Sequence, residues 1–199
     1  QLQAVWLALF QPPSQRLYML GLSPLTLQQP AQPDSPRLLD AFAADGGRYR
    51  PDGQFARALA TLMPLQPTAV ILLDRQGAAS LLDYVGSLDL NGQPLNAAAT
   101  LAWLDAVGTA GPLEAVDAQA AIVQAAIVAL SQSAKLPDFN VLLALAGGHV
   151  QISIKAEQLA ALLNPIEPLQ AQNALIRGAS GYFSVVSLPD GRVGVVPAS

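Results

Sequence analysis

The chain of 199 residues has no cysteine, a single histidine and little charge. The absence of cysteine excludes disulfides, thiolate catalysis and zinc–thiolate sites, and it leaves the cellular compartment open. Only 12% of the residues are charged, about half of the usual ~25%. The formal net charge is −4, whereas binding of nucleic acid needs clustered Lys and Arg. We therefore expect no nucleic-acid partner.

The cationic residues are also unevenly distributed. No lysine precedes Lys135, and the segment between Arg75 and Lys135 contains neither lysine nor arginine. No uninterrupted apolar run reaches the ~18 residues of a membrane-spanning helix, so we expect no span within the chain. Because the chain begins at Gln1 rather than at a methionine, a signal or membrane anchor upstream is one explanation. An arbitrary domain boundary explains the same start equally well.

Hydrophobic residues make up 52% of the chain, enough for a single domain over residues 1–199 with a buried core. Apolar patterns predict strands at 2–10, 16–22, 69–73 and 150–154, and a closing hairpin at 183–196. Helices are expected at 35–46, 54–63, 76–85, 97–107, 112–133, 139–145 and 157–163. This alternation predicts an α/β fold: a three-layer α/β/α sandwich around a mixed β-sheet, with an N-terminal hairpin and a C-terminal hairpin.

Local signals set several of the expected helix ends. Ser35-Pro36 predicts a helix start, with a hydroxyl at the N-cap and proline at the first helical position. Gly46-Gly47 predicts the end of that helix, and Asn96 predicts a cap for the helix at 97–107. The helix at 112–133 is apolar nearly all round, which is typical of a buried helix. The strand at 69–73 is likewise expected to be buried.

Residues 69–96 carry the most informative motif. It runs Asp74-x-x-Gly77, Leu82-Asp83-x-x-Gly86-x-Leu88-Asp89-Leu90, then Leu95-Asn96. This pattern resembles the central block of the LytR-CpsA-Psr family, extracytoplasmic domains that move lipid-linked glycopolymers onto bacterial cell walls. The first hairpin, the helix ending in Gly-Gly and the closing hairpin are similar to that family in the same order. The resemblance implies a bacterial cell-envelope location, a membrane tether outside these residues, and a polyprenyl lipid or lipid-linked glycan as partner.

The departures from the family fall on its charged positions. The family's Arg-Ser-Asp-Thr corresponds here to Gln1, Leu2, Gln3 and Ala4, and its Ser-Ile-Pro-Arg-Asp corresponds to Gly21, Leu22, Ser23, Pro24 and Leu25. Its Arg-x-Arg pair corresponds to Asp105 and Val107, and its Arg-rich turn corresponds to 111–119, which has no arginine. Phosphoryl transfer depends on guanidinium or metal groups that neutralise developing charge. We therefore predict no catalytic residue and no cofactor, with Mg²⁺ required only if transferase activity persists.

Candidate ligand-binding residues remain. Arg48, Arg50 and Arg75, with Arg57, are the main cationic concentration, and an anion could bind there; a solvated loop bridged to Asp45 and Asp52 is the alternative we favour. Asp74 follows a predicted strand, where open α/β sheets place ligand groups, although a helix-capping role for Asp74 is favoured. His149 follows Gly147-Gly148, and we interpret it as an ordinary loop residue.

These observations leave more than one function open. The leading hypothesis is a non-catalytic cell-envelope domain that binds a polyprenyl-linked lipid or acts as a scaffold in glycopolymer attachment. An alternative is an active phosphotransferase whose charges have moved to Arg48, Arg50 or Arg75. A third is a protein-interaction module, in which the low charge reflects a face covered by a protein partner.

Overall fold

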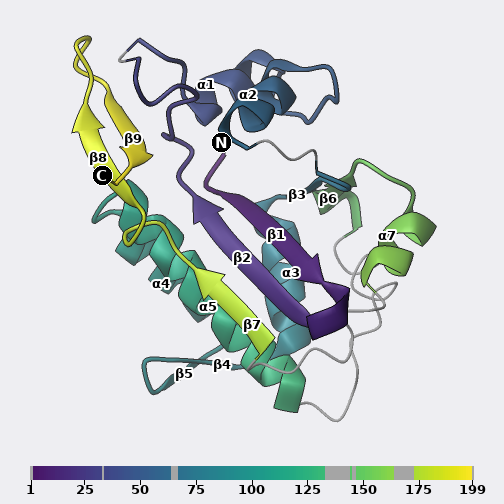
Figure 1. The fold of residues 1–199 in the computed structure, drawn as a ribbon. Coiled ribbons are helices and arrows are strands. Elements are labelled where there is room, and N and C mark those ends of the chain that lie inside the picture. Colours follow the sequence, from purple (N-terminus) through teal and green to yellow (C-terminus); the bar gives the residue numbers. More distant parts are fainter. Residues whose placement is uncertain are drawn as a thin grey trace.

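The computed structural model describes residues 2–32, 34–63, 67–132, 144, 147–163 and 173–198. Strands and helices alternate along the chain, and the central sheet is mixed (Figure 1). The predicted α/β class is therefore confirmed. The helix predicted at 139–145 lies outside the described residues, apart from residue 144.

The central sheet has the strand order β1-β2-β7. Strand β1 (Val5–Gln11) pairs antiparallel with β2 (Arg16–Leu22), and a 3₁₀ turn, η1 (Pro12–Ser14), joins them as predicted. Strand β7 (Ala174–Arg177) pairs parallel with β2. The sequence gives no signal for β7, because four residues are too few to show a periodic pattern.

Helices lie on both faces of this sheet. On one face, α5 (Pro112–Gln132) contacts β2 and β7, and α4 (Ala97–Gly108) and α3 (Arg75–Val85) pack beside it (Figure 1). Trp6 points to this face, since its indole reaches α5. Successive strand residues point to opposite faces, so Val5 and Leu7 point the other way, toward α1 (Leu38–Ala44) and α2 (Gln54–Leu62).

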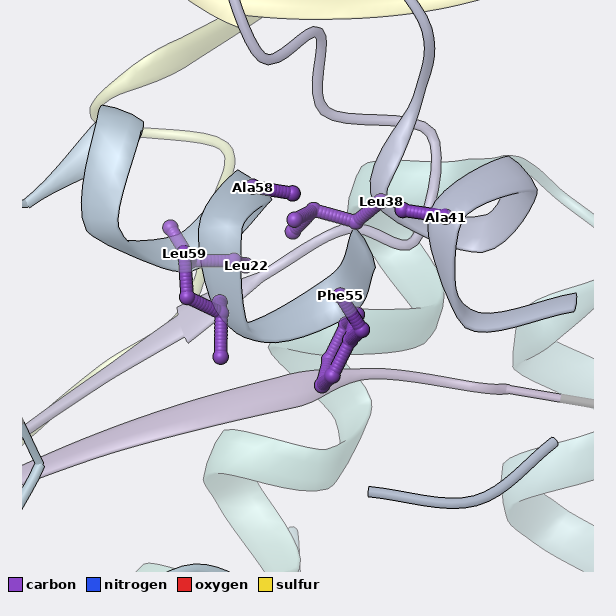
Figure 2. Close-up of a cluster of buried hydrophobic side chains, with 6 residues drawn as sticks. All are labelled: Leu22, Leu38, Ala41, Phe55, Ala58 and Leu59. Carbon is purple, nitrogen blue, oxygen red and sulfur yellow. The ribbon is translucent and has the colours of Figure 1, made fainter. Parts of the chain in front are cut away.

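The core beneath α1 and α2 is a cluster of buried apolar side chains at one end of the sheet. Figure 2 shows its members: Leu22, Leu38, Ala41, Phe55, Ala58 and Leu59. The rings of Phe42 and Phe55 meet edge to face, with their centroids 5.2 Å apart. Because α1 and α2 contact each other and the end of β2, this cluster fixes the two helices over that end only.

Three two-stranded sheets surround the central one. They are β3 (Ile71–Leu73) with β6 (Val150–Ile152), β4 (Leu88–Leu90) with β5 (Gln93–Leu95), and β8 (Phe183–Ser187) with β9 (Val193–Pro197). The last pair is the predicted closing hairpin. Val195 of β9 donates its amide to Leu25 and accepts the amide of Leu27, both at 2.9 Å, so β9 is attached to the segment after β2. A 3₁₀ turn, η2 (Gly147–His149), precedes β6, and α7 (Ala156–Leu163) follows it.

Two local predictions are wrong. Strand β3 is not buried: Ile71 and Leu73 are 47% and 44% exposed, because β3 pairs with β6 outside the central sheet. Helix α1 begins at Leu38 rather than at Pro36, with Arg37 at its N-cap. The Ser35 hydroxyl instead accepts the backbone amide of Gln29 at 2.8 Å. This bond holds the loop before α1, so the N-cap position is taken by Arg37.

Helix α5 departs from prediction in its burial. Its buried residues are Leu113, Val116, Ala118 and Ile122, all in its first half, so it is not buried all round. An 18-residue window of α5 has a mean hydropathy of 1.5, with 22% of the window buried, so by length and composition alone it could cross a membrane. Its contacts with β2 and β7 place α5 against the central sheet, and the expectation of no membrane span within the chain stays a prediction.

Candidate functional site

A buried apolar cluster includes Leu25, which stands where the LytR-CpsA-Psr pattern has an aspartate. Leu113, Val116, Ala179 and Val195 form its centre. Ala4, Trp6, Leu25 and Phe183 are partly buried and pack against that centre. Leu25 replaces an aspartate of the family pattern and Ala4 replaces its threonine, so one charged and one polar position of that pattern now contribute apolar contacts. We call this group the apolar centre.

The apolar centre is tightly packed where β2 meets α5. A side chain at Gly21 would overlap the Cγ1 of Val116 and lie 3.0 Å from the ring of Trp6. The Trp6 Nε1 donates to Gln119 Oε1 at 3.0 Å, which satisfies the indole at the border of the cluster. Gly21 is therefore required for the close approach of the strand to the helix, rather than for a ligand.

Asp117 is the acidic residue of α5 beside the apolar centre. Its Oδ1 accepts the backbone amides of Ala179 at 2.6 Å and Ser180 at 3.2 Å. The adjoining Gly178 leaves no room for a side chain against Asp117. Asp117 therefore fixes the loop before β8, and one of its oxygens is already used for that purpose.

A magnesium site of the family type does not fit these residues. The resemblance implies aspartates at positions held here by Gln3, which is exposed, and Leu25, which packs in the apolar centre. Among the described ranges, no group of three or more His, Cys, Asp or Glu side chains is placed to hold a metal ion. Apolar carbon offers no ligand to a hard cation such as Mg²⁺, which takes oxygen ligands.

Asp105, which replaces an arginine of the family, is bound by another helix. The guanidinium of Arg75, at the start of α3, donates to both carboxylate oxygens of Asp105 on α4, at 2.8 and 2.5 Å. This bidentate contact raises the pKa of Arg75. Val107, the second replaced arginine, is half-buried. Arg75 is thus committed to an ion pair that closes α3 onto α4.

Arg48 and Arg50 lie in the segment between α1 and α2, and both are exposed. Among the described residues, neither forms an ion pair with Asp45 or Asp52, so the prediction of those salt bridges is wrong. Asp45 is buried instead, and its oxygens accept the amides of Phe55 at 2.8 Å and Gln54 at 2.9 Å, at the start of α2. The solvated loop is confirmed, and anion binding at Arg48 and Arg50 stays a prediction.

Asp74 and His149 form a pair that sequence reasoning missed. Asp74 caps α3, since its Oδ1 accepts the amide of Gly77 at 2.9 Å, as favoured from the sequence. Its Oδ2 lies 2.7 Å from Nδ1 of His149, and the Asp74 amide donates to the His149 carbonyl at 3.1 Å. The hydrogen bond from the Gly77 amide is the main cause that lowers the pKa of the Asp74 carboxyl, and the hydrogen bond with His149 is the second.

The Asp74–His149 pair has a structural explanation. It joins the start of α3 to η2 and β6, residues 75 positions apart in the chain. A side chain at Gly77 would meet Leu73 and His149, so this corner is closely packed. No spacing rule connects two residues that are so far apart. The prediction of an ordinary loop histidine was therefore wrong about its contacts.

Comparison with solved structures identifies the fold. TagV of Bacillus subtilis matches with a TM-score of 0.74 at 16% identity, over 98% of this chain and 83% of TagV. The transcriptional regulator yvhJ from Bacillus subtilis matches at 0.70 and 17% identity, over 98% and 80%. TagT bound to LIIa-WTA matches at 0.73 and 11% identity, over 98% and 79%.

These likenesses define the class by fold: the chain has the α/β fold of the LytR-CpsA-Psr proteins, among them TagV and TagT. The fold expected from the sequence resemblance is confirmed. No protein-family model matches the chain, and no curated protein sequence matches it. The three-dimensional likeness thus extends over nearly the whole chain, while the sequences have diverged widely.

Proposed function

We propose that this chain is a non-catalytic domain of the bacterial cell envelope that takes part in attaching glycopolymers to the cell wall as a binding or scaffolding component. The apolar centre is the observation that carries the proposal. The fold is that of glycopolymer-attaching proteins, and TagT has been solved bound to LI-WTA and LIIa-WTA. At Leu25, where the family pattern has an aspartate, an apolar side chain packs in the apolar centre and offers no charge to a phosphate.

The chemistry of that substitution supports a loss of catalysis. A pyrophosphate brings several negative charges, and transfer of a phosphoryl group needs cations that stabilise its transition state. A guanidinium also provides a bidentate donor that a neutral side chain does not reproduce. Burying unpaired phosphate charge against Leu25, Val116 and Val195 would be strongly unfavourable.

Scaffolding is the better supported half of this proposal. Two cavities lined by described residues measure about 200 and 90 Å³, below the ~300–1,000 Å³ of typical ligand pockets. A polyprenyl chain would need a longer apolar channel. The observation in favour of lipid binding is α5, whose second half is apolar and only half-buried from Val123 to Leu130.

The alternative of a relocated active site uses Arg48, Arg50 or Arg75. Arg75 is paired with Asp105, and neither of the two cavities described above is lined by any of the three arginines. The geometry therefore supports this alternative less well than the non-catalytic proposal.

A transfer assay tests the proposal. The purified chain would be incubated with a lipid-linked teichoic acid precursor and peptidoglycan, with and without Mg²⁺, and TagT would serve as the active control. We expect no transfer above background in either condition. Transfer that depends on Mg²⁺ would overturn the proposal and restore the transferase alternative.

Native mass spectrometry with a short polyprenyl pyrophosphate separates the two non-catalytic roles. Binding that is independent of Mg²⁺ indicates that a lipid is held without the catalytic cations. An absence of binding, together with an absence of transfer, indicates a scaffold that acts through other proteins.

A further inference from the structure

Among the residues that the structure describes, helices cover the face of the central sheet opposite α5 at one end only. Leu7 and Leu20 pack against the cluster beneath α1 and α2. One step further along the strands, Leu9 is 52% exposed and Leu175 is 40% exposed. No helix of the described part of the chain lies over this half of the face (Figure 1).

Strand register places these side chains in rows across the sheet. Leu9 is opposite Tyr18, and Tyr18 is opposite Leu175, so one apolar row crosses all three strands. Side chains of paired residues lie on the same face. The next row outward is polar and contains Gln11 opposite Arg16. The row on the inner side contains Leu7, Leu20 and, at the sheet edge, Arg177.

The charge on this face differs from that of the whole chain. The net charge is −4, yet the residues that register places on this face include two arginines and no carboxylate: Val5, Leu7, Leu9, Gln11, Arg16, Tyr18, Leu20, Leu22, Leu175 and Arg177. The ion pairs among the described residues involve Arg37, Arg75, His149 and Arg192, and not Arg16.

A cavity of about 200 Å³ lies where the polar and apolar rows meet. Arg16, Tyr18, Asn173, Ala174 and Leu175 line it. A guanidinium, a phenol and a carboxamide can all donate hydrogen bonds, and the arginine fork matches the two oxygens of a carboxylate. One arginine with neutral donors suits a single negative charge better than a phosphate monoester, which carries nearly two.

We propose that this face binds a long-chain carboxylate, with the carboxylate held by Arg16, Tyr18 and Asn173 and the hydrocarbon chain lying along Leu9 and Leu175 toward Leu7. The charge complementarity of Arg16 and the adjoining apolar row select this occupant. The site is at the β1–β2 turn, the opposite end of the sheet from the apolar centre. It is therefore independent of the proposed function.

Isothermal titration calorimetry with laurate, below its micelle concentration, tests the proposal. We expect saturable binding of laurate, much weaker binding of dodecanol, which lacks the charge, and none of acetate, which lacks the chain. Equal binding of laurate and dodecanol would overturn the role of Arg16. Binding of an acidic amphipathic peptide in place of laurate would reassign the face to a protein partner and overturn the lipid assignment.

Two variants locate the ligand. Arg16→Gln should weaken laurate binding by about 10-fold or more, since hydrogen bonds to charged groups are the strong ones. Arg192→Gln, in the turn between β8 and β9 and paired there with Asp190, is the matched control and should leave affinity unchanged. Leu9→Asn should also weaken binding, whereas Val185→Asn, at a 48% exposed position of β8, should not. Unchanged affinity in both Arg16→Gln and Leu9→Asn would overturn the assignment. Because Arg16 and Leu9 are exposed, both variants are expected to fold.

Discussion

The indole nitrogen of Trp6 donates to the side-chain oxygen of Gln119 at 3.0 Å and joins β1 to α5 over a separation of 113 residues. Trp6→Phe should keep the ring in the apolar centre and remove this bond, leaving the Gln119 oxygen without its donor. We expect the free energy of unfolding to fall by about 1 kcal/mol, measured by urea denaturation followed by circular dichroism.

Trp103→Phe on α4 is the control for this change. Trp103 is partly buried beside a different cluster. Its replacement by phenylalanine should lower the free energy of unfolding by less than Trp6→Phe does. A double variant, Trp6→Phe with Gln119→Leu, should recover part of the loss, because both polar partners are then gone. An equal loss in Trp6→Phe and Trp103→Phe would show that ring size matters, not the hydrogen bond.

Two buried threonine hydroxyls in the described part of the chain have no hydrogen-bond partner, those of Thr26 and Thr100. Burying an unpaired hydroxyl is costly. Thr100→Val keeps the branched shape in α4 and should raise the free energy of unfolding by about 1 kcal/mol, measured by thermal and urea unfolding. Thr61→Val on α2 is the control, because its exposed hydroxyl donates to Arg57; that change should be neutral or slightly destabilising. A lower stability of Thr100→Val would show that the hydroxyl has a partner.

Asp45 makes stability depend on pH. The amides of Phe55 and then Gln54 lower the pKa of its carboxyl, so the folded chain binds this proton less readily than the unfolded chain. Its stabilisation is therefore complete above the unfolded value of ~3.9 and is lost as pH falls through the lower folded value. Asp45→Asn should reduce the melting temperature at pH 7, and the gap to the unaltered chain should narrow below about pH 4.

Thermal melts between pH 7 and pH 2.5 measure the effect of Asp45→Asn. Asp83→Asn, at an exposed position of α3, is the matched control and should leave the melting temperature nearly unchanged at each pH. A gap between Asp45→Asn and the unaltered chain that stays constant down to pH 2.5 would contradict the role of the charge.

Local features of this fold were predictable from the sequence. Asn96 accepts the amide of Ala99 at 2.9 Å and caps α4, as expected. Asp74 caps α3, and Gly46 and Gly47 have φ values of 72° and 70° at the end of α1, where glycine is favoured. Each signal depends on a few neighbouring residues, so a linear pattern contains it.

Contacts between distant segments were not predictable in the same way. The pairing of Asp74 with His149 and of Arg75 with Asp105 depends on how α3 meets η2 and α4. The sequence showed that Leu25 replaces a charged residue of the family pattern, but not that Val195 of the closing hairpin would pack with Leu25 and Ala4. Strand β7 was missed because its four residues are too few to show a periodic pattern. Its place beside β2 is decided by the fold of the rest of the chain.

Gly21 is the most direct test of the packing in the apolar centre. In Gly21→Ala the new methyl group would overlap Val116 and crowd Trp6, and Val116 is fully buried. Overpacking of this kind costs about 1–3 kcal/mol. Val116→Ala alone should also destabilise the fold, because it leaves a cavity. The double variant should lose less than the sum of the two single losses, since the added methyl group occupies the vacated space. Additive losses in urea unfolding would show that Gly21 and Val116 are not in contact, and that the close approach of β2 to α5 is incorrect.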